Sequence, residues 1–410
     1  MKRPDSKRRP LQSFIIIASL IALTVLGCGI EVEGPEPPEG VLYSPVGIAL
    51  HPNGKYLYVV NSNFDLNYRE DRGGSVVVVD TDDLTISPYK LSGVQIGSFG
   101  GDIKLNDPAD GQPTRAFVAV RGNRSVTVLN IEDNGSKLSC DGRSLSTLCE
   151  ITTNNEDPFG LDVATFTTEL EAAGSTELDF VAVTHLLGTD VTTFTLKSGP
   201  VDAQPFSATL ISGANDIARS PRTGQFYATN RFSGSVTAFR PVFDLNADVT
   251  AIVKTGDIFI ENAQPYSGLD SRAIAFNGDG TRAFITNRGP RSLLIADVGP
   301  SNLEANSGTR NRVIDAITLP QDPADLAVIS TGDADLIYVA SYESSVISVI
   351  NPRTRTIVDS IKIPGEPYAM AVDQNRHQRI YVSLFADNAI AVVDIDPTSP
   401  SFNQVVSVIQ

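Results

Sequence analysis

The residues best suited to chemistry in this 410-residue chain are arginines that recur at one position of a repeated motif. Arg231 and Arg288 each follow an asparagine at the end of an apolar run, in QFYATNR and RAFITNR, and Arg121 ends the similar run RAFVAVR. Clustered guanidinium groups bind carboxylates and phosphates through paired hydrogen bonds. These arginines therefore predict an anion site if the fold gathers them on one face.

Aspartates recur at a second position, just ahead of shorter apolar stretches. Asp102, Asp216 and Asp325 occupy it in three copies, where four others have glycine or alanine. Carboxylates gathered there would suit a hard cation. The candidate ligand-site residues at the predicted channel mouth are Asp102, Arg121, Asp216, Arg231, Arg272, Arg288 and Asp325. A structural alternative stays open, because asparagine ends strands, aspartate accepts backbone N–H groups and rim arginines are usually solvated.

A calcium loop is a further hypothesis for the stretch NSNFDLNYRED. It places Asn61, Asn63, Asp65 and Asn67 at alternating positions, as calcium loops do. Arg72 stands where such a loop would supply a bidentate glutamate. An exposed asparagine-rich loop explains the composition equally well, so no cofactor is predicted and Ca²⁺ remains the alternative.

Catalytic motifs are scarce in the sequence. The chain has no G-x-S-x-G elbow, no H-E-x-x-H motif and no glycine-rich phosphate loop. His51, His185 and His377 fall in different turns, so they are expected on opposite faces and not in one metal cluster. The sequence thus favours binding over catalysis.

Repeated strand patterns must position these charged residues. Seven runs carry one aromatic residue at the same place: Tyr58, Phe117, Phe180, Tyr227, Phe284, Tyr338 and Tyr381. A shorter apolar stretch precedes each run and further strand patterns, such as SVVVVD, follow it. Four strands in about 55 residues predict an all-β fold, a seven-bladed β-propeller of four-stranded antiparallel blades. Residues 76–79 are apolar throughout, as in sheets covered on both faces.

Three of the runs resemble the YVTN β-propeller repeats of bacterial and archaeal surface and secreted proteins: YVVN at 58–61, YATN at 227–230 and FITN at 284–287. HPNGKY and SPRTGQF, ahead of two of these runs, add to the resemblance. It covers essentially residues 45–410 and implies the propeller fold without a particular activity. The absence of tryptophan disfavours WD40, kelch and PQQ-type repeats, whereas GIALHP would also suit an NHL-type repeat.

The amino-terminal region reads as an export signal. Five basic residues precede the apolar run 11–27, which is short for a membrane-spanning helix. VLGC at 25–28 resembles the bacterial lipobox, which implies that Cys28 is lipidated, for example with palmitate, and Gly29 by the same resemblance favours the outer membrane. We expect a lipoprotein signal peptide at 1–27, lipidated Cys28 with a Pro/Glu-rich tether at 28–44, and the propeller at 45–410.

Charge and cysteine content bound the partners. Loss of five basic residues and Asp5 with the signal peptide changes the formal charge from −16 to −20, which disfavours nucleic acid because phosphates need Lys and Arg. Cys140 and Cys149 are expected to form a disulfide in an exported protein, with two free thiols as the alternative.

These observations predict a lipid-anchored cell-envelope propeller that acts as a non-catalytic platform for an envelope protein or polymer. The alternative is a lactonase-like or metal-dependent propeller hydrolase with its site at the channel mouth. An architectural surface-layer protein is a third hypothesis. Ring closure is expected to rest on packing between the first and last blades, because every blade is contiguous in sequence.

Overall fold

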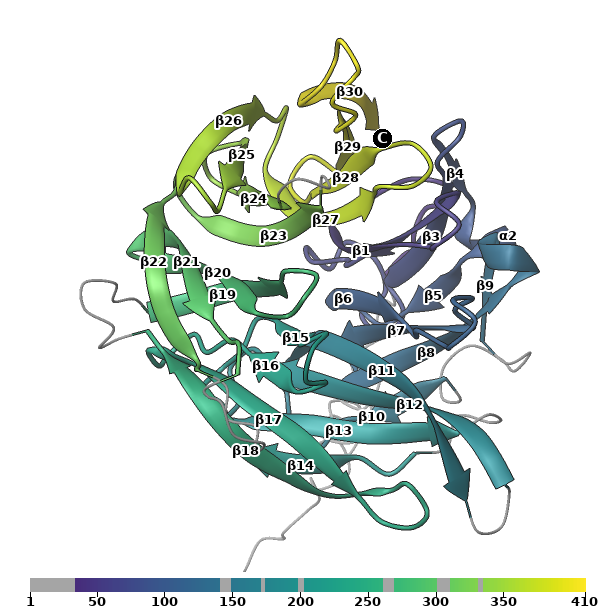
Figure 1. Ribbon diagram of the computed structural model, residues 1–410. Coiled ribbons are helices and arrows are strands. Elements are labelled where there is room, and N and C mark those ends of the chain that lie inside the picture. The colour runs from purple at the N-terminus through teal and green to yellow at the C-terminus, as the bar shows by residue number, and fades with distance from the viewer. Residues whose placement is uncertain are drawn as a thin grey trace, which may run out of the picture. The chain divides into compact units, whose positions relative to one another are not determined.

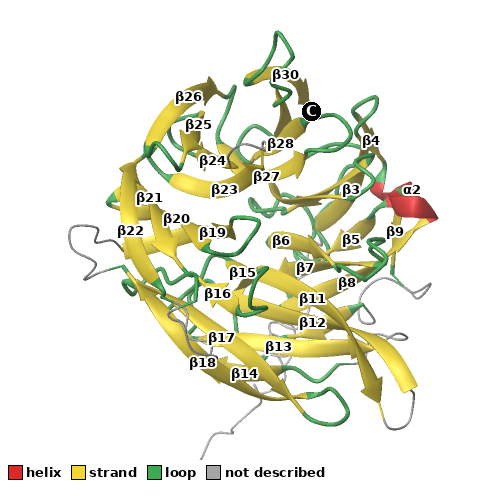
Figure 2. Cartoon of the chain, in the orientation of Figure 1, coloured by secondary structure: helices red, strands yellow, loops and turns green. Residues whose placement is uncertain are grey.

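Strands are the main regular elements of the structure, a computed structural model (Figures 1 and 2). It describes residues 34–140, 149–170, 174–197, 203–260, 269–300, 310–330 and 335–410. The predicted signal peptide, Cys28 and residues 29–33 of the tether lie outside this part. Residues 36–410 form one unit, whose described residues include a single short α-helix, α2 (Tyr89–Ser92).

The first three sheets follow one another along the chain, each with antiparallel strands. The first contains β1 (Pro45–Leu50), β2 (Tyr56–Asn61), β3 (Gly74–Asp80), β4 (Thr85–Ser87) and β5 (Val94–Ile96). The second contains β6 (Gly100–Leu105), β7 (Arg115–Val120), β8 (Ser125–Glu132), β9 (Lys137–Ser139) and β10 (Glu150–Thr152), with the 3-10 helix η1 (Asp133–Gly135) after β8. The third contains β11 (Pro158–Leu170), β12 (Gly174–His185), β13 (Asp190–Lys197) and β14 (Phe206–Thr209).

The fourth sheet joins two groups of four antiparallel strands. One group is β15 (Ile217–Arg219), β16 (Phe226–Ala228), β17 (Ser235–Phe243) and β18 (Val249–Phe259). The other is β19 (Leu269–Phe276), β20 (Arg282–Gly289), β21 (Arg291–Asp297) and β22 (Arg312–Thr318). A single parallel pair, Phe259 with Arg312, connects β18 to β22. The groups are therefore two meanders that touch at their outer edges.

Two further four-stranded antiparallel sheets complete the described chain. The first of them contains β23 (Pro323–Ser330), β24 (Asp335–Ser341), β25 (Val346–Asn351) and β26 (Thr356–Lys362). The last contains β27 (Pro367–Asp373), β28 (Arg379–Leu384), β29 (Ala389–Asp394) and β30 (Gln404–Ile409).

The first strands of these groups lie around a common centre (Figure 1). Each contacts the first strand of the next group, in the order β1, β6, β11, β15, β19, β23, β27, and β27 contacts β1. The last sheet is contiguous in sequence, so its junction with the first sheet is made by side chains. Leu42 packs in one cluster with Tyr381 and Ile409, and Ser383 Oγ lies 3.2 Å from Val46 O.

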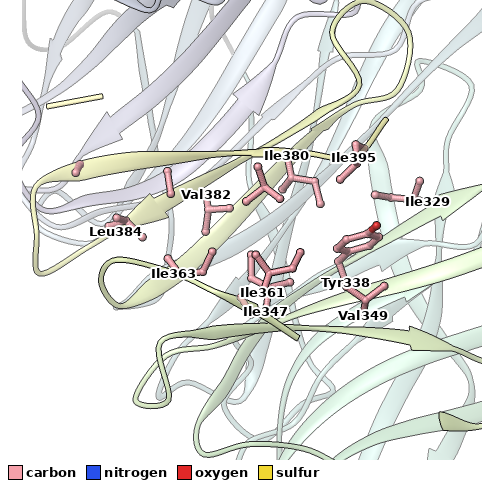
Figure 3. Close-up of a cluster of buried hydrophobic side chains, with 14 residues drawn as sticks. Ile329, Tyr338, Ile347, Val349, Ile361, Ile363, Ile380, Val382, Leu384 and Ile395 are labelled. Atoms are coloured by element: carbon pink, nitrogen blue, oxygen red, sulfur yellow. The ribbon is translucent and has the colours of Figure 1, made fainter. Parts of the chain in front are cut away.

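The apolar core lies between neighbouring sheets. Figure 3 shows one such layer, in which Ile347 and Val349 of β25 face Ile380 and Val382 of β28. The seven recurrent aromatic side chains of the second strands are all at most 2% exposed, which confirms that they belong to the core. Burial of one large apolar side chain contributes roughly 1.5–3 kcal/mol, so each sheet depends on its neighbours for stability.

Some of these aromatic residues also reach the next sheet through their hydroxyl groups. Tyr58 donates to Gly135 O (2.8 Å) and Tyr338 donates to Asn403 Oδ1 (2.9 Å). Because both hydroxyl groups are buried, these bonds satisfy donors that would otherwise be costly to bury.

Cys140 and Cys149 are joined as a disulfide, with their Cα atoms 5.8 Å apart. The bond links the segment after β9 to the start of β10 across residues 141–148, which are not described. None of the helices among the described residues has the length and apolar character needed to cross a bilayer.

Two substitutions at Tyr338 separate packing from hydrogen bonding. We expect Tyr338→Phe to lower the free energy of unfolding by about 1 kcal/mol, because only the bond to Asn403 is lost. Tyr338→Ala should cost about 3–5 kcal/mol, because it opens a cavity between two sheets. Denaturant unfolding followed by circular dichroism measures both. Equal losses for the two variants would show that the ring does not support this layer.

Candidate functional site

Two adjoining cavities lie at the centre, where the first strands converge. The channel cavity, about 300 Å³, has charged lining residues Asp102, Lys104, Asp162, Asp216 and Asp325. The mouth cavity, about 290 Å³, has Arg121 and a set of aromatic side chains in its lining. Arg272, Arg288, Asn215, Phe159, Tyr368 and Val46 line both cavities. The two cavities thus adjoin, with guanidinium groups at the mouth cavity and carboxylates along the channel cavity.

The three predicted aspartates all line the channel cavity, together with two charged residues that sequence reasoning missed. Asp162 and Lys104 each lie two positions beyond the aspartate position of their strands, β11 and β6. Side chains two residues apart in a strand point to the same face, so both also reach the channel. The alternation of side chains along a strand, extended by two residues from the aspartate position, would have predicted both residues.

A local irregularity helps to aim these side chains into the channel. The register of β6 against β7 shifts between Gly100 and Ile103, next to Asp102. The same shift occurs in β23 between Pro323 and Asp325. Such bulges redirect side chains and bend a strand, so the aspartate position coincides with a bend of the first strand.

Three of the channel carboxylates hold the next strand in place. Asp162 accepts a hydrogen bond from Arg219 N (2.6 Å), Asp216 from Ile274 N (2.9 Å) and Asp325 from Met370 N (2.7 Å). Each donor belongs to the first strand of the following group. The structural alternative predicted for the aspartates is therefore realised at Asp216 and Asp325, and Asp162 follows the same rule.

Asp102 differs from the other carboxylates, because its ionic partner lies on its own strand. Its Oδ2 is 3.3 Å from Lys104 Nζ, and the Asp102 charge raises the pKa of Lys104. Lys104 is the single lysine in the lining of the channel cavity. The channel cavity therefore holds four carboxylates, one ammonium group and the guanidinium groups of Arg272 and Arg288 that it shares with the mouth cavity.

The buried position of these carboxyl groups shows in their titration. Burial raises the pKa of Asp216 to about 7 and those of Asp162 and Asp325 to about 6, although the Lys104 charge opposes each rise. Burial penalises the charged form of a carboxyl group. Part of this set consequently carries protons near neutral pH.

The predicted arginines pair with aspartates of the following sheet. Arg121 Nη2 lies 3.1 Å from Asp157 Oδ1, and Arg288 Nε lies 2.5 Å from Asp322 Oδ1. Both aspartates have left-handed backbone conformations, with φ of 56° and 59°, directly before β11 and β23. Aspartate tolerates this conformation better than most residues. Sequence reasoning missed these partners, although Asp-Pro precedes the apolar run in both copies.

A third aspartate, Asp270, serves two arginines. Arg272 binds it through Nε and Nη2, both at 2.9 Å. Arg231 Nε lies 3.8 Å from Asp270 Oδ1, beyond hydrogen-bond range, and its Nη1 donates to Leu186 O. Arg231 therefore shares Asp270 with Arg272 but lines neither cavity.

Arg288 retains free donors. Its Nε approaches Asp322 and Pro323 O (3.4 Å), but neither Nη group donates a hydrogen bond to any residue of the described chain. Burial lowers the pKa of Arg288, and the Arg272 charge lowers it further. The guanidinium groups therefore repel one another in a partly dehydrated site, and a bound anion would relieve that repulsion.

The asparagines before the arginines close the turns. Asn230 Oδ1 accepts from Ser212 N (2.7 Å) and its Nδ2 donates to Ser235 O (2.9 Å). Asn287 Nδ2 similarly donates to Pro290 O (2.8 Å). In both Asn-Arg pairs the asparagine is structural, and of the two arginines only Arg288 lines the central cavities.

The residues proposed for calcium occupy different environments. Asn61 and Asn63 are buried, and their amide groups bond to Val41 O and Ser98 Oγ. Asp65 and Asn67 are exposed. Among the residues that the structure describes, no group of three or more His, Cys, Asp or Glu side chains is placed to hold a metal ion.

The three histidines lie apart, each with its own contacts. His185 bonds Glu156 O (2.7 Å) and Thr192 Oγ1 (2.9 Å). His377 Nε2 lies 3.0 Å from Asp82 Oδ1, and His51 Nδ1 is 3.3 Å from Asn53 N. None of them lines the two central cavities.

The raised pKa of Asp216 predicts a pH-dependent stability difference. The stabilisation from protonated Asp216 is complete below its unfolded pKa of 3.8 and is lost as pH rises through about 7. The stability of the wild type relative to Asp216→Asn should therefore fall between about pH 4 and pH 7, by up to about 1.4 kcal/mol per pH unit, and level off above that range. Denaturant unfolding at each pH measures this difference, in which the histidine contributions cancel. A constant difference would contradict the assignment.

Comparisons with known proteins agree on the architecture. No protein-family model matches the chain, and no curated protein matches its sequence. The β-propeller domain of Cps50 (Swd1) from Myceliophteria thermophila is similar in structure, with a TM-score of 0.57 and 12% identity over 87% of this chain and 99% of that one. A periplasmic gluconolactonase from Pseudomonas aeruginosa has a TM-score of 0.53 and 17% identity over 79% and 87%.

A third solved structure, a 6-phosphogluconolactonase candidate from Bacteroides uniformis, has a TM-score of 0.51 and 16% identity over 77% of this chain and 84% of its own. Identities this low speak to fold alone. With its four-stranded antiparallel sheets and these structural neighbours, the chain has a β-propeller fold.

Proposed function

We propose that this protein is a seven-bladed propeller that binds an anionic group of a partner at its channel mouth. The blade count is supported by the circuit of first strands from β1 to β27 and back. Each of these strands opens a group of four or five antiparallel strands. The YVTN-like runs add independent support from the sequence.

The proposed protein is exported and lipid-anchored, most simply at the outer membrane. Support comes from the basic head and apolar run of residues 1–27 and from the lipobox-like VLGC that ends at Cys28. Residues 28–44 would serve as a tether and residues 45–410 as the propeller. In that location the partner is an envelope protein or polymer, and the acidic surface disfavours nucleic acid.

The free donors of Arg288 are the observation that carries the proposal. This side chain lines both central cavities beside Arg272, and its Nη groups donate no hydrogen bond within the described chain. Two N–H groups that point from one guanidinium match the two oxygens of a carboxylate or a phosphate. The site is therefore suited to binding a terminal anionic group.

Binding also accounts for the remaining charged residues better than catalysis does. Asp162, Asp216 and Asp325 are each used to fix a neighbouring strand, and Arg272 is held by Asp270. These hydrogen bonds and ion pairs hold the residues around the cavity in fixed positions. Less conformational entropy is then lost when a ligand binds.

Substitution of Arg288 tests the proposed binding site. Acetate and inorganic phosphate should raise the unfolding temperature of the wild type in a saturable way, because they bind only the folded state. We expect Arg288→Gln to remove this effect. Arg291→Gln is the matched control, because Arg291 is exposed and lines neither central cavity. Equal anion responses in the two variants would contradict the proposed site.

A hydrolase is the second candidate, and the pKa of Asp216 favours it. A carboxyl group that titrates near pH 7 is well placed to act as a general base, and two of the structural neighbours bear lactonase names. If the protein hydrolyses lactones, Asp216→Asn should lower kcat by a factor of about 100 or more. A pH-stat assay with simple aldonolactones measures this. Full activity in the variant would exclude Asp216 as the base.

A further inference from the structure

We propose that the mouth cavity selects an organic monoanion whose charge is carried on an apolar ring. The inference rests on the proposed anion site and names the chemistry of its ligand. Two features of the mouth cavity lead to it: a continuous aromatic wall beside the arginines and a layer of carboxylates beneath them.

The aromatic wall is built from five rings in edge or tilted contact. Phe99 lies 5.9 Å from Phe64, Phe64 lies 5.2 Å from Phe385, Phe385 lies 5.9 Å from Tyr368, and Tyr368 lies 6.2 Å from Tyr342, measured between ring centroids. All five side chains line the mouth cavity. The rings therefore form one apolar surface and not five separate contacts.

Two rings of this wall occupy the position that arginines hold in other blades. Tyr342 and Phe385 directly follow the second strands β24 and β28, as Arg121 follows β7. The mouth is consequently divided into an aromatic side and a guanidinium side. The two sides meet where Arg121 lies over Phe99, with its Cζ 5.8 Å from the ring centroid.

Part of the wall is open to solvent. Phe64 is 47% exposed although it touches two other rings, and Phe385, Tyr368 and Tyr342 are half-buried. Exposed apolar surface in a concave site favours an apolar ligand. Aromatic rings stack or meet edge to face at centroid distances of about 4.5–7 Å, so a ligand ring would continue the series.

The layer beneath restricts the charge of the ligand. Asp162, Asp216 and Asp325 line the adjoining channel cavity, and Lys104 is the sole lysine there. A second anionic group that reached down the channel would face these carboxylates. A ligand rich in hydroxyl groups would instead place some of them against the phenylalanine rings Phe64, Phe99 and Phe385, which offer no hydrogen-bond partner. Both arguments favour a single charge on an apolar ring.

Ligand comparison on the whole protein tests the inference. Isothermal titration with benzoate, acetate and glucuronate should give benzoate the lowest Kd, about tenfold below acetate, as one ring contact of moderate strength would produce. Phe64→Ala should bring benzoate close to acetate and leave the acetate Kd unchanged. Phe232→Ala is the control, because Phe232 is 59% exposed and lies outside both cavities.

The outcomes separate this inference from the proposed function. Equal affinities for benzoate and acetate, both abolished by Arg288→Gln, would overturn ring selection and keep the anion site. Tighter binding of glucuronate than of benzoate would also overturn it, in favour of a sugar acid. Failure of all three anions to bind would overturn both proposals. The wild-type ratio alone decides the matter if Phe64→Ala fails to fold.

Discussion

Each sheet of this protein has two apolar faces, and neither can be covered from within its own group of strands. In β3, residues 75–79 are at most 1% exposed, although their side chains point alternately to opposite faces. Only neighbouring sheets can cover both faces, and the last sheet must then cover the first. The packing of Leu42 and Ile409 with Tyr381 makes that junction. Everything at the centre follows from this requirement, because it brings the first strands together.

The charged centre is at once part of the architecture and the candidate site. Several charged side chains on the first strands line the channel, where they are partly dehydrated. Asp216 compensates for burial by accepting the N–H of Ile274 in the next strand, and its pKa still rises to about 7. Arg121 and Arg288 likewise pair with the sheet that follows. A ligand can use only those hydrogen-bond donors that these structural contacts leave free, above all the Nη groups of Arg288.

The architecture was largely predictable from the sequence because strand periodicity and the recurrent aromatics are local signals. The same signals placed Asp102, Asp216 and Asp325 in the channel. Asp162 was missed because its strand has glycine at the aspartate position, Gly160, and the carboxylate two residues later. The pairing of Arg288 with Asp322 depends on which blade follows which and on a left-handed turn, and neither shows in composition.

The aromatic wall was also invisible in the sequence. Its rings come from turns of separate blades, from the residue before β6 and, for Tyr368, from β27, and they become neighbours only when the sheets pack around the centre. The residues of the calcium hypothesis show a different limit of sequence spacing. Alternating polar residues at 61–67 look alike in the sequence, but Asn63 is buried and Asp65 is exposed, so spacing alone did not predict a shared environment.

The most direct test of the central claim is to observe the guanidinium groups themselves. Nuclear magnetic resonance of ¹⁵N-labelled arginine side chains, recorded during titration with acetate, reports which guanidinium meets the anion. We expect saturable shifts for Arg288, smaller ones for Arg272, and none for the exposed Arg291. An unchanged Arg288 signal at acetate concentrations that shift other arginines would show that the channel mouth is not the anion site.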